Sequence, residues 1–121
     1  MGLLTARLTL NSRNATTDAL NLVVGDELLF SKDVIQKRIV TSTTAAKFLE
    51  ADDYGKCYVY LRNLSSTAGE IIYIRTGASD STNIHDIGPE EFIFFSWSGG
   101  EDLNYDAAAG NPVLEMYLFE V

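Results

Sequence analysis

The side chains that could do chemistry are few and widely separated. The chain has one histidine, His85, beside Asp86, and one cysteine, Cys57, inside an apolar segment. No serine or cysteine motif near His85 supplies a nucleophile, so this pattern favours a surface imidazole. The apolar neighbours of Cys57 favour a buried, inert thiol, and a single cysteine excludes an intrachain disulfide. The sequence therefore predicts no catalytic residues and no enzymatic activity.

Metal and cofactor binding are also predicted to be absent. A cupin-type site takes several histidines, and only one is present. Adjacent carboxylates occur at several places, but neighbours on a strand point to opposite faces, so none is a ready acid–base pair. Such pairs include Asp52/Asp53, Glu90/Glu91 and Glu101/Asp102. Calcium in an acidic loop such as 101–106 stays an alternative, because carboxylates bind hard cations. A solvated acidic face is the favoured interpretation, since no Asp-x-Asp-x-Asp pattern occurs.

Charge is distributed unevenly along the 121 residues, whose net charge is −8. Residues 1–60 hold seven basic and seven acidic side chains, whereas nine carboxylates and no lysine or arginine follow Arg75. This balance predicts no nucleic-acid binding, because phosphate contacts need clustered cations. No apolar run approaches the ~20 residues of a membrane helix, and no signal-peptide pattern is visible. We therefore expect no membrane association.

The segment Glu91–Trp97 is predicted to be the strand around which the fold is organised. It is rich in aromatic and β-branched residues, and it lies between a Gly-Pro turn and a Gly-Gly pair. Because side chains alternate along a strand, Phe92 and Phe94 share one face, and Ile93 and Phe95 share the other. Both faces are apolar, so this strand is expected to be central in its sheet and covered on both sides.

Further strands are predicted along most of the chain. Alternation indicates a half-buried strand over Leu4–Leu10. β-type residues continue at 16–24, 27–30, 38–44, 56–63, 70–76, 83–87, 101–107 and 113–120, with a break at Gly25-Asp26. Residues 31–37 fit a helical turn or a loop equally well. One helix is predicted from Thr43/Thr44 to Asp53, because apolar residues recur there at i, i+3 and i+4.

Short strands joined by turns at roughly regular spacing predict an all-β fold. We expect an antiparallel β-sandwich of the jelly-roll type with one short helix. The length fits a single sandwich domain over residues 1–121, in which residues 1–14 are a candidate N-terminal arm.

Several predicted strands are apolar on both faces, although a two-layer sandwich buries only one face of each sheet. The second apolar face would contain Tyr58, Tyr60, Tyr73, Phe92 and Phe94. Either the helix and loops cover it, or identical subunits pack on it. The oligomer interface is the favoured interpretation.

Three segments resemble small virion proteins of tailed bacteriophages. They are residues 58–64 (YVYLRNL), residues 87–97 (IGPEEFIFFSW) and residues 113–120 (VLEMYLFE). In that family a "YVYVKNL" segment precedes a "GPGEF" aromatic strand and a closing strand that ends in acidic residues. The likeness spans residues 54–121, and Glu90 stands where the pattern has its second glycine. The resemblance implies a β-sandwich structural protein without catalytic residues.

What the resemblance implies about function follows from where such proteins occur. They are capsid decorations, head fibres, knobs or tail components, often trimeric. A capsid decoration or cement protein, made in the host cytoplasm and assembled with other virion proteins, is the favoured hypothesis. The alternative is a tail-fibre, head-fibre or knob module that binds a host receptor or glycan. Trp97 and Tyr105 are its candidate contact residues, although Trp97 is better explained by the core or an interface.

The uneven charge also suggests how such a protein would face a particle. Capsid surfaces are often acidic, so basic side chains on the attached side would lessen repulsion. We therefore expect Arg7 and Arg13 in the arm, and Lys37 and Arg38 in a loop over 32–38, to dock on the partner. The acidic loops 77–86 and 99–106 would then face outward.

Overall fold

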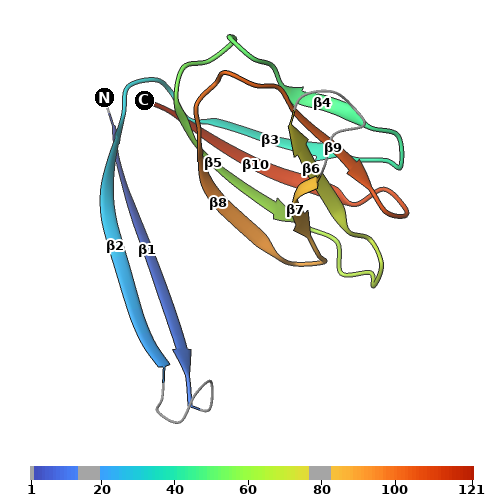
Figure 1. The fold of residues 1–121 in the computed structure, drawn as a ribbon, viewed down its shortest axis with the longest axis horizontal. Helices are drawn as coiled ribbons and strands as arrows, with labels where there is room; N and C mark the ends of the chain where they lie inside the picture. Colours follow the sequence, from blue (N-terminus) through green and yellow to red (C-terminus); the bar gives the residue numbers. More distant parts are fainter. Residues whose placement is uncertain (1, 14–19, 77–82) are drawn as a thin grey trace. The chain divides into compact units, whose positions relative to one another are not determined.

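The computed structural model describes residues 2–13, 20–76 and 83–121, and these residues form ten β-strands and no helix (Figure 1). The chain divides into two compact units, Met1–Lys32 and Asp33–Val121. The sandwich domain predicted over residues 1–121 is thus confined to the second unit. The first unit is longer than the arm predicted over residues 1–14.

The N-terminal unit is a β-hairpin formed by β1 (Gly2–Ser12) and β2 (Leu20–Phe30). The two strands pair antiparallel along their whole length, so the strand predicted over Leu4–Leu10 is confirmed. The break predicted at Gly25-Asp26 is wrong, because β2 continues through both residues. Gly25 stays in register opposite Arg7, and a glycine that keeps its place in the ladder does not end a strand.

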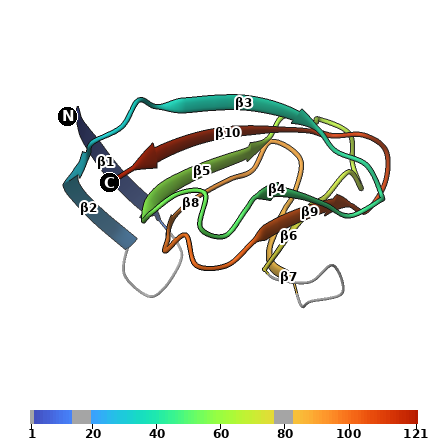
Figure 2. The same cartoon turned by 90° about the horizontal axis from the view of Figure 1, so that it is seen from above.

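The C-terminal unit contains eight strands. They are β3 (Ile35–Val40), β4 (Ala46–Leu49), β5 (Cys57–Asn63), β6 (Ile72–Thr76), β7 (Asn83–Ile87), β8 (Phe92–Trp97), β9 (Leu103–Ala107) and β10 (Val113–Glu120). Sheet I has the order β3-β10-β5-β8, and sheet II has the order β4-β9-β6-β7. The two sheets form the two layers of a sandwich (Figure 2). Successive strands alternate between the sheets except at β6 and β7. This connectivity is that of an eight-stranded jelly roll, as the sequence predicts.

The core lies between the two sheets. Alternate residues of β5 and β10 point inward, and side chains such as Val59, Leu61 and Leu114 are fully buried. They pack against Ile72 and Ile87 from sheet II. Each fully buried aliphatic side chain contributes about 1.5–3 kcal/mol relative to exposure, so this layer supplies most of the stability of the unit.

The position predicted for the organising strand is wrong. β8 is the last strand of sheet I and pairs with β5, so it lies at an edge and not at the centre. The predicted alternation is correct, because Phe95 and Trp97 point toward the core while Phe92 and Phe94 point outward. The prediction that both faces of this strand are covered is also wrong, because Phe92 and Phe94 on its outward face are exposed.

The helix predicted from Thr43/Thr44 to Asp53 is also wrong. Ala46–Leu49 form β4, whose pairing with β9 shifts register between Lys47 and Leu49. This bulge turns two consecutive residues, Phe48 and Leu49, toward the core, which imitates the apolar spacing of a helix. The turn that follows holds Asp52 at a φ of 69°.

Candidate interaction site

The outward side of sheet I carries a cluster of aromatic side chains. Because β8, β5 and β10 are neighbours in this sheet, every second side chain on each strand points away from the core at adjacent positions. Phe92 is 58% exposed and Phe94 is 41% exposed. We call the cluster the aromatic face. It comprises Tyr58, Tyr60, Phe92, Phe94, Tyr117 and Phe119.

The rings of the aromatic face contact one another across the strands. The ring centroid of Tyr60 lies 5.6 Å from that of Tyr117, edge to face, and 6.1 Å from that of Phe92. Tyr58 stacks on Phe94 with a centroid distance of 6.3 Å. Aromatic rings attract one another at these separations and restrict each other's rotation. The aromatic face is therefore a preformed apolar surface.

Cationic side chains border the aromatic face. The Lys56 Nζ atom lies 5.4 Å from the centroid of the Tyr58 ring, within reach of a cation–π interaction. Arg62 and Glu115 are cross-strand partners on the same side of the sheet, and Arg38 contacts Glu115 at 3.6 Å. Residues 33–121 contain six cations and 14 carboxylates, and three of those six cations lie here. The border is thus locally positive on a strongly acidic unit.

The outward side of sheet II is polar. Tyr73, the fifth predicted interface residue, lies here on β6, with the Arg75 guanidinium 5.9 Å from its ring centroid. Arg75 also contacts Asp106 at 3.4 Å and donates a hydrogen bond from Nε to Asn83 Oδ1. The structure therefore brings the other four predicted interface residues together on sheet I and separates Tyr73 from them.

Two members of the aromatic face are not among the predicted interface residues. Tyr117 and Phe119 lie on β10, opposite Tyr60 and Tyr58 in register. Alternation along residues 113–120 predicts that both share a face. Only the pairing of β10 with β5, which the sequence does not reveal, adds them to the aromatic face.

The hairpin has one aliphatic side and one side on which polar and apolar residues are mixed. Cross-strand partners share a side, so Leu8 lies beside Val24 and Leu10 beside Leu22. Leu8 is 47% exposed and Val24 is 53% exposed. The opposite side, which we call the polar side, carries Thr5, Arg7, Thr9 and Glu27, and also the exposed Leu3, Val23 and Leu29. We call the apolar side the aliphatic face. It comprises Leu4, Ala6, Leu8, Leu10, Leu22, Val24 and Leu28.

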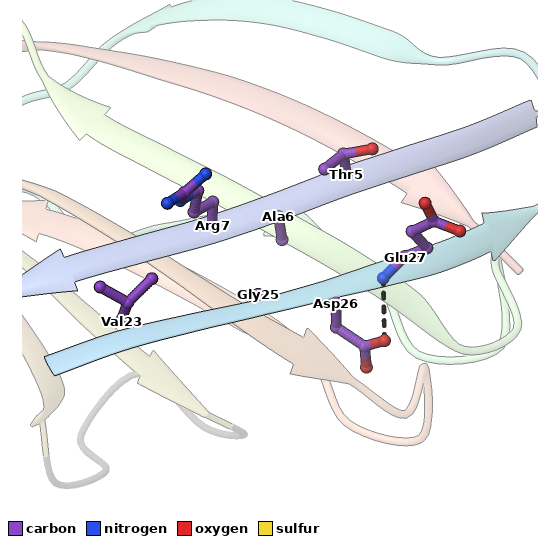
Figure 3. A pocket seen from close by; sticks show the side chains of 7 residues that line it. All are labelled: Thr5, Ala6, Arg7, Val23, Gly25, Asp26 and Glu27. Carbon is purple, nitrogen blue, oxygen red and sulfur yellow. Dashed lines mark hydrogen bonds between the residues drawn. The ribbon is translucent and has the colours of Figure 1, made fainter.

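A shallow hollow lies at the middle of the hairpin (Figure 3). It forms because Gly25 has no side chain, which leaves space beside Arg7. Six of its seven lining residues are exposed, and the lining contains no nucleophile with a neighbouring base. The hydrogen bond drawn there joins the Glu27 N–H to Asp26 Oδ1 at 2.8 Å. The hollow is a surface feature without the groups that catalysis requires.

The four predicted docking cations are divided between the two units. Arg7 lies on the polar side of the hairpin, and Arg13 follows the end of β1. Lys37 and Arg38 are neighbours on β3, so their side chains leave the strand on opposite faces. The loop predicted over 32–38 is wrong from Ile35 onward, because those residues pair with β10. Of the predicted acidic loop 77–86, residues 77–82 lie outside the described part of the chain.

Neither reactive side chain is placed for catalysis. Cys57 is fully buried, as predicted, and its thiol donates to the Gly55 carbonyl oxygen at 3.4 Å. Burial, with a smaller contribution from Glu120, raises the pKa of this thiol to about 11. His85 is half-buried, and its ring centroid lies 5.4 Å from that of Phe95. The predicted surface imidazole is therefore wrong, because alternation along β7 turns His85 into the sandwich.

The two residues expected of a receptor-binding module are not exposed in loops. Trp97 is 6% exposed, and its Nε1 donates to the Glu101 carbonyl oxygen at 3.0 Å. Tyr105 is half-buried, with its ring centroid 5.9 Å from that of Phe48. Both residues contribute to packing of the sandwich.

Carboxylates before and on β9 have partners within the chain. Asp102 Oδ1 accepts a hydrogen bond from the Ala51 N–H at 2.7 Å, and its Oδ2 lies 3.2 Å from Lys47 Nζ. The Ala51 hydrogen bond and the Lys47 cation lower the pKa of Asp102. Asp106 faces Arg75. Across residues 2–13, 20–76 and 83–121, no three histidine, cysteine, aspartate or glutamate side chains gather as a metal site would require.

Residues 33–121 thus form a jelly roll with one aromatic and one polar outer face, preceded by a hairpin with one aliphatic side. The chain matches no protein-family model, and a search of curated protein sequences finds no match. In the described residues there is no helix that could cross a membrane.

Proposed function

We propose that this chain is a non-enzymatic structural protein of a tailed-phage virion, which decorates or cements the capsid as a homo-oligomer. The observation that carries the proposal is where the three segments that resemble phage virion proteins lie. Residues 58–64, 87–97 and 113–120 cover most of β5 and all of β8 and β10, which are adjacent strands of sheet I. The resemblance therefore concerns one continuous sheet, whose outward side is the aromatic face.

The character of the two outer faces supports an interaction role. Contiguous exposed apolar surface with a polar border marks an interaction site in soluble proteins. Exposed Phe92 and Phe94, bordered by Arg38 and Arg62, fit that description. The polar outer side of sheet II suits contact with water. A decoration protein needs this division, since one side binds the assembly and the other faces solvent.

The fold and the charge agree with this role. Jelly rolls recur in viral capsid proteins and in lectins, although a fold alone does not define a function. The 14 carboxylates of residues 33–121 would give a particle covered with many copies a strongly negative surface. Such a surface keeps particles apart in solution.

Purified particles of the phage that encodes the chain provide the test. Immunogold labelling with an antibody against the chain is expected to decorate the heads, with pre-immune serum as the control. Mass spectrometry of the same particles should detect the chain in many copies. Its absence from purified particles would refute a virion role. Labelling confined to tails would refute capsid decoration.

A further inference from the structure

We propose that the aliphatic face of the hairpin packs on the aromatic face of sheet I in a second copy of the chain. Copies would then associate by exchanging hairpins. This inference rests on the self-association in the proposed function and deepens it by naming the two surfaces that meet.

The hairpin needs a partner to be stable. A two-stranded hairpin by itself is marginally stable in water, because it has no second layer to cover its apolar side. Leu8, Leu10, Leu22 and Val24 are all exposed at neighbouring positions on that side. A partner that covers these side chains would remove from water the longest apolar stripe of the hairpin.

The aromatic face fits the hairpin in chemistry and shape. Two sheets pack face to face when each offers a continuous apolar side. The aliphatic face offers branched side chains in two rows, and the aromatic face offers rings in three rows. One contact between them covers both exposed apolar surfaces. Contact between two hairpins would leave Phe92 and Phe94 exposed.

Charge favours the same pairing. Arg38, Lys56 and Arg62 border the aromatic face, together with the carboxylates of Glu115 and of Glu120, whose Oε2 accepts a hydrogen bond from the Gly55 N–H. The charged residue on the aliphatic side of the hairpin is Asp26, opposite Ala6. The two surfaces are therefore of opposite sign. Contact between two sandwich units would instead bring together two chains that each hold an excess of eight carboxylates in residues 33–121.

The size of the contact indicates a closed, symmetric assembly. Eleven residues per strand make the hairpin ~36 Å long, whereas the six to eight residues of β8, β5 and β10 span ~20–26 Å. A hairpin packed on one such sheet, whichever copy supplies it, leaves about a third of its length uncovered. One contact buries roughly 500–700 Å² over both partners, below the ~1,200 Å² of stable interfaces. A dimer with two such contacts, or a ring in which every hairpin is used, reaches that size.

Two double variants test the contributions of the two surfaces to association, one surface at a time. The hairpin variant, Leu8→Asp with Val24→Asp, places charge on the aliphatic face. The sheet variant, Phe92→Asp with Phe94→Asp, places charge on the aromatic face. The matched control, Thr5→Asp with Thr9→Asp, adds the same charge to the polar side of the hairpin. Analytical ultracentrifugation over micromolar to millimolar concentration measures association of each protein and of mixtures.

We expect the wild-type chain to associate and the control to associate within about threefold of it. Each double variant alone should lose at least 30-fold in affinity, as expected when central interface residues are removed. An equimolar mixture of the two double variants should associate more strongly than either variant alone, because one hairpin–sheet contact remains between them, but more weakly than the wild-type chain, which makes two such contacts. Association in the mixture also shows that both surfaces are folded. If the mixture associates no more than either variant alone, the inference is wrong.

The remaining outcomes also decide the question. Self-association of the sheet variant at wild-type strength would mean that hairpins bind one another. Self-association of the hairpin variant would mean that sheets bind one another. A monomeric wild-type chain would mean that the hairpin covers its own sheet or binds a different protein. Each result overturns the inference, and none of them depends on whether antibody labels the phage head.

Discussion

Replacing Asn63 with alanine is expected to destabilise the sandwich strongly. The Asn63 side chain is fully buried at the end of β5. Its Nδ2 donates to the carbonyl oxygens of Glu70 at 2.8 Å and Ile87 at 3.0 Å, and its Oδ1 accepts from the Ser65 N–H at 3.0 Å. One side chain thus joins β5 to the loop before β6 and to the end of β7. Alanine removes all three hydrogen bonds at once.

The magnitude follows from the groups left behind. A buried polar group without a partner costs about 1–3 kcal/mol. The Glu70 and Ile87 carbonyls lose a donor each, while the Ser65 N–H is nearer the surface, where water can replace the amide. We expect the free energy of unfolding to fall by about 3–4 kcal/mol. For a unit of this size, that lowers the midpoint temperature by roughly 15–25 °C.

Urea and thermal unfolding followed by fluorescence of the buried Trp97 measure the effect. Arg62→Ala is the matched control, because Arg62 precedes Asn63 and points outward; it should cost less than about 1 kcal/mol. Asn63→Asp should be as harmful as alanine at neutral pH, since a carboxylate would face two carbonyl oxygens. It should partly recover in acid, where the protonated carboxyl can donate. A loss below about 1 kcal/mol for Asn63→Ala would refute the reasoning.

Three further substitutions and one thiol reaction test other parts of the structure. Glu90 has a φ of 65°, so Glu90→Gly should stabilise the sandwich by about 0.5 kcal/mol, seen as a higher urea midpoint; a lower midpoint would count against strain at this turn. The buried Cys57 thiol should react with a maleimide at pH 8 at least about 100-fold more slowly than in denaturant. Because its pKa rises from near 9 to about 11 on folding, stability should fall as pH rises through that window, by up to about 1.4 kcal/mol per unit, and a Cys57→Ala variant should lack this part of the fall. Asp102→Asn should lower stability at neutral pH, and the difference from wild type should vanish as acid protonates Asp102 through its lowered pKa; a difference that persists in acid would mean that charge is not the cause.

Local patterns were sufficient to predict most strands and the faces of their side chains. Alternation over residues 56–63 and 113–120 places Val59 and Leu114 inward and Tyr60 and Tyr117 outward, as the structure has them. These patterns work because a pleated strand alternates with a period of two whatever its neighbours are. The sandwich and its jelly-roll type follow from the number and spacing of such strands.

What local patterns could not predict is which strands are adjacent. Tyr73 alternates as regularly as Tyr60, yet it lies on the other sheet, because strand order depends on long-range pairing. The edge position of β8 could not be predicted for the same reason. A strand with an exposed aromatic face and a strand with a covered aromatic face show the same pattern of residues. The bulge beside Phe48 produced a false helix, because one extra residue breaks the period of two. Glu90 could not be predicted for a different reason. Its backbone lies in the left-handed region, which glutamate does not favour, so the residue type gives no sign of this conformation.

The pairing of β3 with β10 has a consequence for the order in which the chain folds. β1 and β2 are joined by a short connection, so the hairpin can form soon after residue 30 has been synthesised. β3 must wait for β10, the last strand, before its ladder exists, because the register joins Val40 to Val113 and Ile35 to Leu118. Such long-range closure is slow compared with hairpin formation. During synthesis on a ribosome, the residues of the aliphatic face therefore emerge well before β10, which completes the aromatic face.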